Sequence, residues 1–500
     1  MGGAKGSQVP AIALAFWLVA PASGIAQTQD PVLVAPPRSI ADITAILDQE
    51  KPDPAKRAKR EADANAEPPS VQGEALGKFY FQRCQARAAL GRAKEAIADC
   101  EKAISLGGDY GHHVSRVQQF LETQYRHVGD YKSAEKLLQE MIAHFSNQSK
   151  ARLPGLFLRG IVGSLQVGDV PRAQNYVNRA NAFLRESRTW SNPNFDKFRS
   201  SWEASVEDAQ ARLNENRGFY REAEAGFRRA KAQQIDAIGK ISTWPSAPPR
   251  DQFEQSIDYL GAFEGRAKYK QGKLAEAEID IRRALLSRLK ANGKYNPDTA
   301  QIVMIFARLM NEQARWADSE KLLRTAIDIY QTLGYPDDIN AIVTARYLLA
   351  AALYTQRRYD EANAVYASLD DAMKNWDEKR QIRFRYGWSR IFSAYFTRDI
   401  EKGIALAREY VTVEKKRVGD KHHDTVMARA ILGAGLAFAR KDAEAAEHFK
   451  ASIPLLLATA RESSDDETGL GSAADSRMQN VLEAYAAMLS RSADPGAASE

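Results

Sequence analysis

The residues best suited to chemistry in this 500-residue chain are few, and their spacing does not fit a catalytic site. Seven histidines include two adjacent pairs, His112-His113 and His422-His423. Neighbouring side chains point in different directions on a helix, so such pairs make a poor metal site without further ligands. The sequence contains no HExxH motif, no G-x-S-x-G nucleophile elbow and no glycine-rich phosphate loop. We therefore expect no catalytic residue, no metal site, no cofactor and no enzyme activity.

The two cysteines, Cys84 and Cys100, are the only thiols in the chain. They are symmetric about residue 92, and two helical patterns meet there at Gly91-Arg92. Facing Cα atoms on antiparallel helices whose axes are 8–10 Å apart lie about 3.4–5.4 Å from each other, which overlaps the range that a disulfide needs. We expect a disulfide within this helix pair, formed in an oxidising compartment. Two reduced thiols in the core are the alternative.

The first 26 residues have the pattern of a signal peptide. Lys5 precedes the apolar run 11–20, and small residues then lead to Ala26. The run is too short to span a bilayer as a helix, and no later window is apolar enough to do so. We expect cleavage before Gln27 and a periplasmic or secreted protein without a membrane span. An uncleaved anchor is the alternative.

Composition and charge favour a helical protein and disfavour a nucleic-acid partner. The 70 Lys and Arg residues against 64 Asp and Glu give a formal charge of +6, and the two signs are interspersed. A nucleic-acid-binding protein would concentrate its basic residues on one face. Strand-type alternation is rare, which predicts an all-α fold. Because 500 residues exceed what one hydrophobic core serves, we expect several domains or a repeat array.

Self-similarity is the main signal after residue 72. A helical pattern, a turn and a second helical pattern with a small residue near its start recur along the chain. In the C-terminal half this residue recurs at steps of 42, 43, 41 and 42, at Ala277, Ser319, Ala362, Gly403 and Ala445. Less regular copies place it at Ala96, Ala134, Ala173 and Ala223. Small side chains let two antiparallel helices approach closely, and bulky residues four positions later fill the groove to the next unit.

These units resemble tetratricopeptide (TPR) repeats, and the longer ones are similar to the repeats of kinesin light chains. The resemblance implies an all-α, right-handed superhelical solenoid of antiparallel helix pairs, since each pair buries its apolar face only by stacking on its neighbours. We expect irregular repeats over residues 73–252, long repeats over 253–490 and a flexible tail over 491–500. Proline punctuates residues 27–72, where we expect a linker with one short helix at 39–49.

Loops between the long repeats also match one another. Each has an Asp just before an apolar-periodic run, where a helix N-cap is needed. These loops are Asn296-Pro297-Asp298-Thr299, Pro336-Asp337-Asp338-Ile339 and His422-His423-Asp424-Thr425. The spacing predicts that an Asp caps the helix that follows each loop.

A second resemblance concerns the order of the segments. A signal-like segment, a proline-broken segment at 41–54 and the long repeats together look like the N-terminal half of exported TPR–CHAT proteins. Residues 434–457 and 482–485 resemble the last repeat before the caspase-like CHAT domain. The His- and Cys-containing segments of that domain do not occur here, so no catalytic role is carried over. Two functions follow: a scaffold or adaptor that binds a protein or peptide, or the recognition arm of a CHAT protease whose catalytic part lies outside this chain.

In TPR proteins the first helix of each repeat lines the concave groove. Counting back from the small residues gives ten candidates for partner contact: Tyr259, Arg266, Tyr269, Arg308, Asn311, Tyr347, Tyr354, Arg385, Trp388 and Tyr395. Tyr, Trp and Arg dominate the energetics of protein interfaces, and Arg and Asn can pair with the backbone or carboxylates of a peptide. We expect these residues to form a groove for a peptide or partner protein. Ordinary packing between repeats is the alternative for each of them.

Overall fold

The computed structural model describes residues 39–51, 53–107, 112–191, 194–244, 250–397, 399–464 and 472–491. All of these residues belong to one unit of the chain, Pro36–Glu500. The expected signal peptide, its cleavage site, the beginning of the expected linker and residues 492–500 of the expected tail lie outside the described residues, as do the side chains of His112 and His113.

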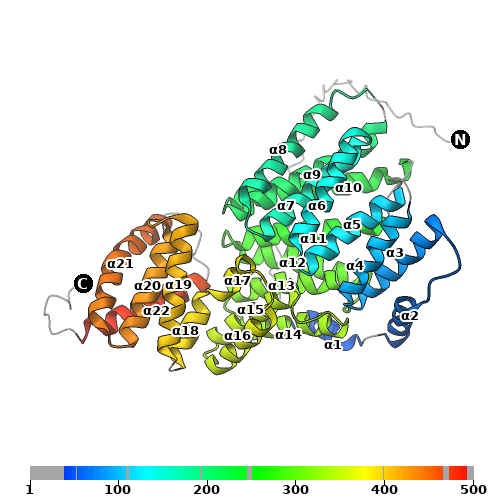
Figure 1. Ribbon diagram of the computed structural model, residues 1–500. Helices are drawn as coiled ribbons and strands as arrows, with labels where there is room; N and C mark the ends of the chain where they lie inside the picture. The colour runs from blue at the N-terminus through cyan, green and yellow to red at the C-terminus, as the bar shows by residue number, and fades with distance from the viewer. Residues whose placement is uncertain are drawn as a thin grey trace, which may run out of the picture. The chain divides into compact units, whose positions relative to one another are not determined.

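The described residues form an all-α solenoid of antiparallel helix pairs, and no strand occurs among them (Figure 1). Nine pairs follow one another along the chain: α3 (Gly73–Ala89) with α4 (Ala93–Leu106), α5 (His112–His127) with α6 (Tyr131–Asn147), α7 (Leu153–Gln166) with α8 (Val170–Ser187), α9 (Asn194–Asn216) with α10 (Tyr220–Lys240), α11 (Arg250–Tyr269) with α12 (Leu274–Asn292), α13 (Pro297–Glu312) with α14 (Trp316–Thr332), α15 (Asn340–Thr355) with α16 (Tyr359–Met373), α18 (Trp388–Phe396) with α19 (Ile400–Val418), and α20 (His423–Phe438) with α21 (Asp442–Ser464).

The remaining helices stand outside the nine pairs. They are α1 (Ala41–Gln49), α2 (Pro54–Asn65), α17 (Glu378–Arg385), α22 (Ser472–Leu489) and the short 3₁₀ helices η1 (Lys150–Arg152) and η2 (Ile241–Thr243). None of the helices in the described part of the chain is long and apolar enough to cross a membrane.

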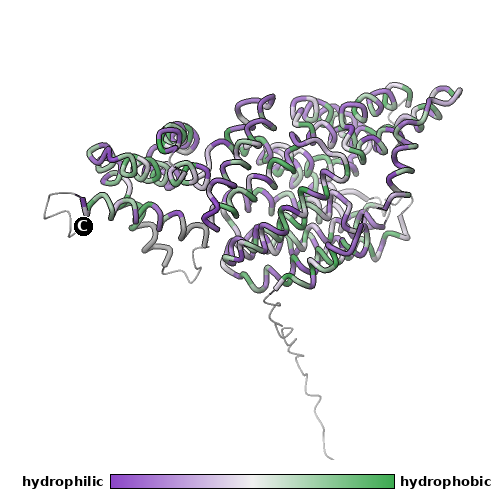
Figure 2. Tube along the Cα trace, turned by 90° about the horizontal axis from the view of Figure 1, so that it is seen from below, coloured by the Kyte–Doolittle hydropathy of each residue, from purple (hydrophilic) through white to green (hydrophobic). Residues whose placement is uncertain are grey.

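The small residue near the start of each second helix is buried in all nine pairs, which confirms the repeat pattern. The bulky residues four positions later are buried as well, at Phe227, Ile281, Leu323, Tyr366 and Phe449. Hydrophobic and hydrophilic residues alternate along the helices accordingly (Figure 2). Each pair therefore closes around a small side chain and presents a large one to its neighbour.

First helices lie on the inner side of the array. The first helices of neighbouring pairs contact one another: α7 with α9, α11 with α13, α13 with α15, α15 with α18, and α18 with α20. Within the described residues, no two second helices of neighbouring pairs make a comparable contact. Because elements on the inner radius of a curved array lie closer together, the first helices line the concave side, as the TPR resemblance implies.

The segment expected to be a linker contains two helices instead of one, and both pack onto the solenoid. Ile43 and Leu47 of α1 are 0% exposed, and Arg282 of α12 donates to both carboxylate oxygens of Asp42 at 2.8 Å. Arg87 of α3 donates to the carbonyl oxygen of Ala64 in α2 at 3.0 Å. Pro54 does not interrupt α2, because it is the first helical residue, where a missing N–H costs nothing.

The turn of the first pair reaches the loop that follows α14. Gly91 has a φ of +69°, and a side chain there would overlap the backbone of Gly334. Glycine is therefore required at position 91 both for its conformation and for this close approach. The contact joins the first pair to the junction of the sixth and seventh pairs.

The expectation that an Asp caps the helix after each of the three matching loops is wrong. Asp298 and Asp424 lie in the first turn of their helices, whereas Asn296 and His422 are the residues that cap α13 and α20. Ile339 precedes α15 without a side-chain cap. The side chains of Asn296 and His422 also supply a hydrogen-bond acceptor. The residue type alone therefore could not show which position of each loop is the N-cap.

The first helix of the eighth pair is interrupted. Gly387 has an extended conformation, with φ −125° and ψ 139°, between α17 and α18. A Cβ atom on Gly387 would overlap the hydroxyl of Tyr347. Arg385 is therefore on a separate short helix. The spacing predicts a shared helical face for Arg385, Trp388 and Tyr395, and this prediction is wrong for Arg385.

Cys84 and Cys100 form a disulfide across the first pair. Their Cα atoms are 5.5 Å apart, and both side chains are 0% exposed. The bond joins α3 to α4 on either side of the turn at Gly91-Arg92. It covalently closes the hairpin whose turn contacts the loop after α14.

Candidate functional site

A charged strip lies on the inner side of the fourth to sixth pairs. Three arginines occupy equivalent places, six residues before the turn, on α9, α11 and α13: Arg212, Arg266 and Arg308. Arg212 pairs with Asp208 at 2.8 Å, and Arg266 pairs with Glu215 of the preceding first helix. The guanidinium groups of Arg212 and Arg266 lie 4.4 and 4.5 Å from the ring centre of Phe263. Arg212 and Arg266 therefore link the first helices α9 and α11.

Further residues of this strip also link one pair to the next. Lys270 of α11 pairs with Glu312 of α13 at 3.1 Å. Tyr269 is only 4% exposed, and burial raises the pKa of its hydroxyl. Asn311 is half-buried on α13. Because the charges of the strip are largely paired within the chain, its main role in the structure is cohesion between repeats.

An aromatic cluster lies nearer the C-terminus, where three consecutive pairs meet. It consists of Tyr354, Tyr359, Trp388, Phe396 and Phe438, from α15, α16, α18 and α20. Ring centres are 5.3 Å apart for Tyr354 and Trp388, 4.9 Å for Tyr359 and Phe396, and 5.7 Å for Phe396 and Phe438. The side chain of Phe396 is 37% exposed, so the cluster reaches the protein surface.

The hydroxyl of Tyr354 is the polar centre of this cluster. Tyr354 is 4% exposed, and burial raises the pKa of its hydroxyl. Asn480 of α22 donates a hydrogen bond from its side-chain amide to this hydroxyl at 2.8 Å. A residue 126 positions later in the sequence thus contacts the inner side of the seventh pair.

The structure brings some of the ten expected groove residues to the surface and buries others. Three are buried, at 4% exposure each: Tyr269, Tyr354 and Tyr395. Six are half-buried: Tyr259, Arg266, Arg308, Asn311, Tyr347 and Trp388. Arg385 is exposed, but it belongs to α17. The buried tyrosines pack between repeats, because a large side chain on the inner helix also faces the neighbouring pair.

The hydroxyl groups of these tyrosines are mostly engaged within the chain. Tyr395 donates to the carbonyl oxygen of Ile431 at 3.1 Å. Tyr259 donates to Asp298 at 2.7 Å, and burial together with this carboxylate holds the pKa of Tyr259 well above its ordinary value. Phe396 is the exposed member of the aromatic cluster, whereas Tyr359, Trp388 and Phe438 are half-buried and Tyr354 is buried.

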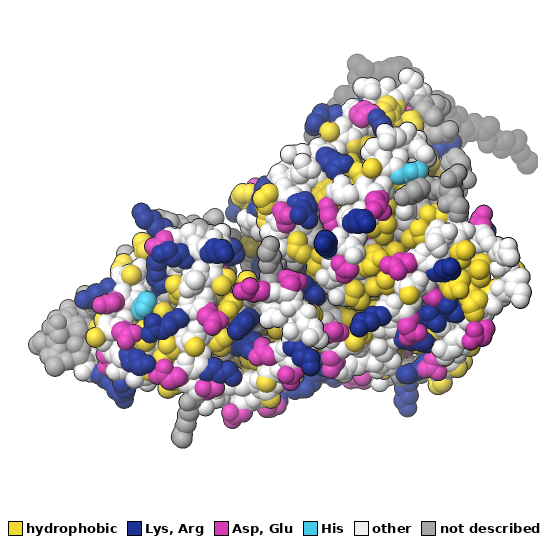
Figure 3. Space-filling model, in the orientation of Figure 1, with side chains coloured by type: hydrophobic (Ala, Val, Ile, Leu, Met, Phe, Trp, Pro, Cys, Tyr) yellow, Lys and Arg dark blue, Asp and Glu magenta, His cyan; other side chains and the backbone are white. Residues whose placement is uncertain are grey.

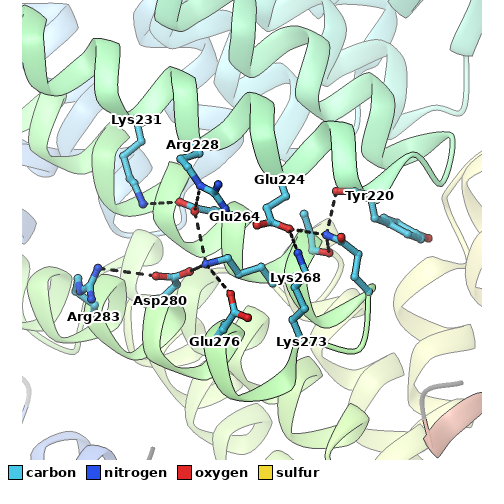
Figure 4. A network of polar contacts seen from close by, with 12 residues as sticks. Tyr220, Glu224, Arg228, Lys231, Glu264, Lys268, Lys273, Glu276, Asp280 and Arg283 are labelled. Atoms are coloured by element: carbon cyan, nitrogen blue, oxygen red, sulfur yellow. Dashed lines mark hydrogen bonds and ion pairs between the residues drawn. The ribbon is translucent and has the colours of Figure 1, made fainter. Parts of the chain in front are cut away.

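A buried ionic network joins the fourth and fifth pairs (Figure 4). Glu264 of α11 is 3% exposed and accepts from Arg228 and Lys231 of α10. Burial alone would raise the pKa of Glu264, but Lys231 and Arg228 outweigh it and lower that pKa. Lys268 donates to Asp280 of α12 at 2.7 Å. Every charge named here has an opposite partner, so the network stabilises the interface and offers no free acid or base.

A repeated polar clamp is a feature that the sequence analysis missed. A Glu directly after the small residue of one pair accepts from a Gln and a Lys or Arg in the turn of the next pair. The three sets are Glu224 with Gln271 and Lys273, Glu278 with Gln313 and Arg315, and Glu320 with Gln356 and Arg358. A Gln-x-Lys/Arg pattern recurring at steps of 42 and 43 residues was the available signal.

Charged and metal-ligating side chains are dispersed over the described surface. On the face drawn in Figure 3, basic and acidic side chains are interspersed without a large patch of one sign. Within the described ranges, no group of three or more His, Cys, Asp and Glu residues is placed to hold a metal ion. His422 is engaged as the cap of α20, accepting from the backbone N–H of Asp424 at 3.2 Å.

Comparisons with known proteins found similarity only to solved structures. No family model and no curated protein matches the chain. A putative kinesin light chain of Podosopora anserina with TPR-like repeats aligns with 13% identity over 42% of this chain and 98% of its own, with a TM-score of 0.35.

Two other solved structures cover more of the chain. A signal-transduction ATPase with a TPR sensor from Pyrococcus horikoshii aligns with 11% identity over 79% of this chain and 55% of its own, with a TM-score of 0.44. A Rap protein in complex with Competence and Sporulation Factor aligns with 12% identity over 73% of this chain and 99% of its own, with a TM-score of 0.42.

Proposed function

We propose that this protein is a non-catalytic interaction scaffold that binds a segment of a partner protein on the inner side of its solenoid. The aromatic cluster carries this proposal. Four helices from three consecutive pairs converge on it, and Phe396 brings an aromatic ring to the surface at 37% exposure. Aromatic side chains that are partly buried in a rigid frame are typical anchors of protein interfaces.

The neighbouring charged strip complements the aromatic cluster. Arg266 and Arg308 are half-buried on consecutive first helices, so they retain accessible surface although Arg266 is already paired with Glu215. A partner could exchange ion pairs with the strip and would gain most of its binding free energy by covering apolar rings. An extended ligand, such as a peptide or a surface segment of a protein, can contact the charged strip and the aromatic cluster at the same time. A small metabolite would not need both surfaces.

Loss of a partner from one surface variant tests the proposal. Phe396→Asp places a charge in the aromatic cluster at an exposed position and should leave the fold intact. Phe219→Asp is the matched control, since Phe219 is 54% exposed at the turn of the fourth pair. Affinity capture from an extract of the source organism should recover a protein with wild type and with Phe219→Asp but not with Phe396→Asp. Identical recovery by all three would contradict the proposal.

The proposal includes export to an oxidising compartment. The signal-like pattern at residues 1–26 and the disulfide between Cys84 and Cys100 support it. N-terminal sequencing of protein from its native host should begin at or near Gln27. A cytoplasmic protein that keeps Met1 would refute this part.

The alternative role, as the recognition arm of a CHAT protease, rests on the sequence resemblance alone. This role predicts that affinity capture recovers a caspase-like protein with wild type and that the Phe396→Asp variant does not recover it.

A further inference from the structure

A cleft of about 480 Å³ lies where the turns of the second and third pairs meet α17. Residues 129–132 at the turn between α5 and α6, residues 166–167 at the end of α7, Asn340 at the start of α15, and Asp377, Arg380 and Phe384 line it. Binding sites for small molecules have volumes of about 300–1,000 Å³. The described residues that line the cleft include no member of the aromatic cluster, so the two sites are separate.

Arg380 gives this cleft a guanidinium group without an acidic partner. Its Nη2 atom is buried and has no hydrogen-bond partner, and no carboxylate in the described part of the chain forms an ion pair with it. Arg288 also has a buried nitrogen without a partner, but its guanidinium group pairs with Asp258 at 2.6 Å. A partly buried cation is costly without a counter-charge, and a ligand could supply that charge.

Two aromatic rings and a glycine hold the Arg380 guanidinium group in place. Its Cζ atom is 3.8 Å from the ring centre of Trp376 and 5.5 Å from that of Tyr131. Trp376 is buried, and its Nε1 atom donates to the carbonyl oxygen of Asp338 at 3.2 Å. A Cβ atom on Gly129 would overlap the guanidinium group. Because aromatic rings contact the face of this planar group, its N–H donors remain at the edge for a ligand.

The other lining side chains indicate the charge and shape of a matching ligand. Asp130 and Asp377 cap α6 and α17, accepting from backbone N–H groups at 3.0 and 3.1 Å. These two carboxylates would repel a doubly charged anion such as phosphate more strongly than a singly charged one. Val167 is 38% exposed, and the ring of Phe384 also lines the cleft. A single carboxylate on a small apolar body therefore matches the lining.

We propose that this cleft binds a carboxylate group at the edge of the Arg380 guanidinium group, with the apolar part of the same ligand against Val167 and Phe384. Arginine commonly binds carboxylates through two parallel hydrogen bonds. The carboxylate can belong to a small organic acid or to a Glu or Asp side chain of a bound protein, because both present the same group. The inference goes beyond the proposed function and does not depend on the aromatic cluster.

Pairs of probes that differ only in charge test this site in the full-length protein. Isothermal titration calorimetry compares phenylacetate with phenylacetamide, and phenylacetate should bind at least tenfold more tightly. Arg380→Gln should weaken phenylacetate binding at least tenfold. Lys374→Gln is the matched control, because it removes an exposed positive charge outside the cleft, and it should bind like wild type.

A second pair of probes distinguishes the two sources of the carboxylate. The blocked dipeptide acetyl-Glu-Phe-amide should bind more tightly than acetyl-Gln-Phe-amide. Tighter binding of the Glu dipeptide than of phenylacetate would assign the cleft to a protein side chain, and the reverse order would assign it to a small organic acid.

Stability and a second variant separate binding from a purely structural role of Arg380. Arg380→Gln should keep the melting temperature of wild type, since losing the unpaired donor offsets the lost cation–π contact. Gly129→Ala should displace the guanidinium group and weaken phenylacetate binding. Gly218→Ala should not, because Gly218 has a similar φ of +85° and no atom near its missing Cβ.

The proposal is overturned if folded wild type does not distinguish the charged from the neutral probe in either pair. It is also overturned if inorganic phosphate binds more tightly than both carboxylates, or if Arg380→Gln binds phenylacetate as wild type does. A lower melting temperature of Arg380→Gln, together with equal binding of charged and neutral probes, would make Arg380 a structural contact only. Capture of a partner through Phe396 is measured independently, so the scaffold function can survive each of these outcomes.

Discussion

At the scale of single residues, the polar clamp between the fifth and sixth pairs depends on Glu278. This carboxylate is 2% exposed and accepts from Arg282, Gln313 and Arg315. Glu278→Ala would leave Arg282 paired with Asp42 and Arg315 paired with Asp318. The variant should therefore lose the hydrogen bonds to this buried carboxylate, at a cost of about 1.5–3 kcal/mol. Urea unfolding followed by circular dichroism should show this loss.

The control for Glu278→Ala is an exposed inter-repeat ion pair. Glu401 accepts from Lys441 at 2.9 Å and its side chain is 73% exposed, so Glu401→Ala should change stability by less than about 1 kcal/mol. Equal losses for the two variants would show that the clamp contributes no more than a surface pair.

Acid sensitivity should arise at Glu264. Burial acts to raise the pKa of this carboxyl, but Lys231 and Arg228 outweigh it, so the folded-state pKa lies below the ordinary 4.5. The unfolded chain then binds the extra proton, and the stabilisation is complete above pH 4.5 and disappears as the pH falls through the folded pKa. Melting temperatures between pH 3 and pH 7 should fall less steeply below about pH 5 for Glu264→Gln than for wild type. Parallel profiles would exclude Glu264 as a source of the acid sensitivity.

At the scale of elements, α1 should be held by its buried side. Leu47 is 0% exposed, and its neighbour Ile46 is 41% exposed on the same helix. Leu47→Ala removes buried apolar contacts, at a cost of about 2–5 kcal/mol, and should release α1 from α12 and α14. Hydrogen exchange at residues 41–49 should accelerate in Leu47→Ala and stay close to wild type in Ile46→Ala. Unchanged protection in Leu47→Ala would mean that the ion pair between Asp42 and Arg282 is sufficient to hold the helix.

The sequence predicted the repeated helix pairs well because their signal is local. A small residue such as Ala277 and a bulky one such as Ile281 are four positions apart, so one helix face carries both. The docking of α1 escaped prediction, since its partners Arg282 and Lys321 lie more than 200 residues away in the chain. The glycine at the interruption, Gly387, could not be explained from the sequence for a similar reason, because the space for a side chain there is occupied by the hydroxyl of Tyr347 in the preceding pair.

At the scale of the whole molecule, Gly91 and Gly334 provide the contact between the first pair and the junction after α14. Gly91→Ala would introduce a Cβ atom into the backbone of Gly334 in addition to straining a φ of +69°. Gly168→Ala is the matched control, because Gly168 has a φ of +75° at the equivalent turn and no atom near its missing Cβ. Both variants should lose about 1 kcal/mol or more to backbone strain.

Only Gly91→Ala should also loosen the distant loop. Hydrogen exchange of the backbone amides at residues 333–336 should accelerate in this variant and not in Gly168→Ala. Equal exchange in the two variants would show that the loop after α14 does not depend on this contact.

The candidate site was predictable in its location and only partly in its residues. Helical spacing placed Tyr354, Trp388 and Arg308 on first helices, and the structure has them there. Spacing alone could not distinguish a side chain that faces the groove from one that faces the next pair, so Tyr354 and Tyr395 proved to be buried. Phe396 was not singled out, since its exposure depends on where α18 ends against α16 and α20.

Site-specific photo-crosslinking tests the central claim most directly. The photoreactive residue p-benzoylphenylalanine replaces Phe396 in one full-length variant and Phe219 in another, and both are irradiated in the native host. A scaffold that uses the aromatic cluster should yield a discrete crosslinked protein from position 396 and none from position 219, although Phe219 is the more exposed at 54% against 37%. No adduct at position 396, or the same adducts at both positions, would contradict the assignment of the inner surface as the binding site.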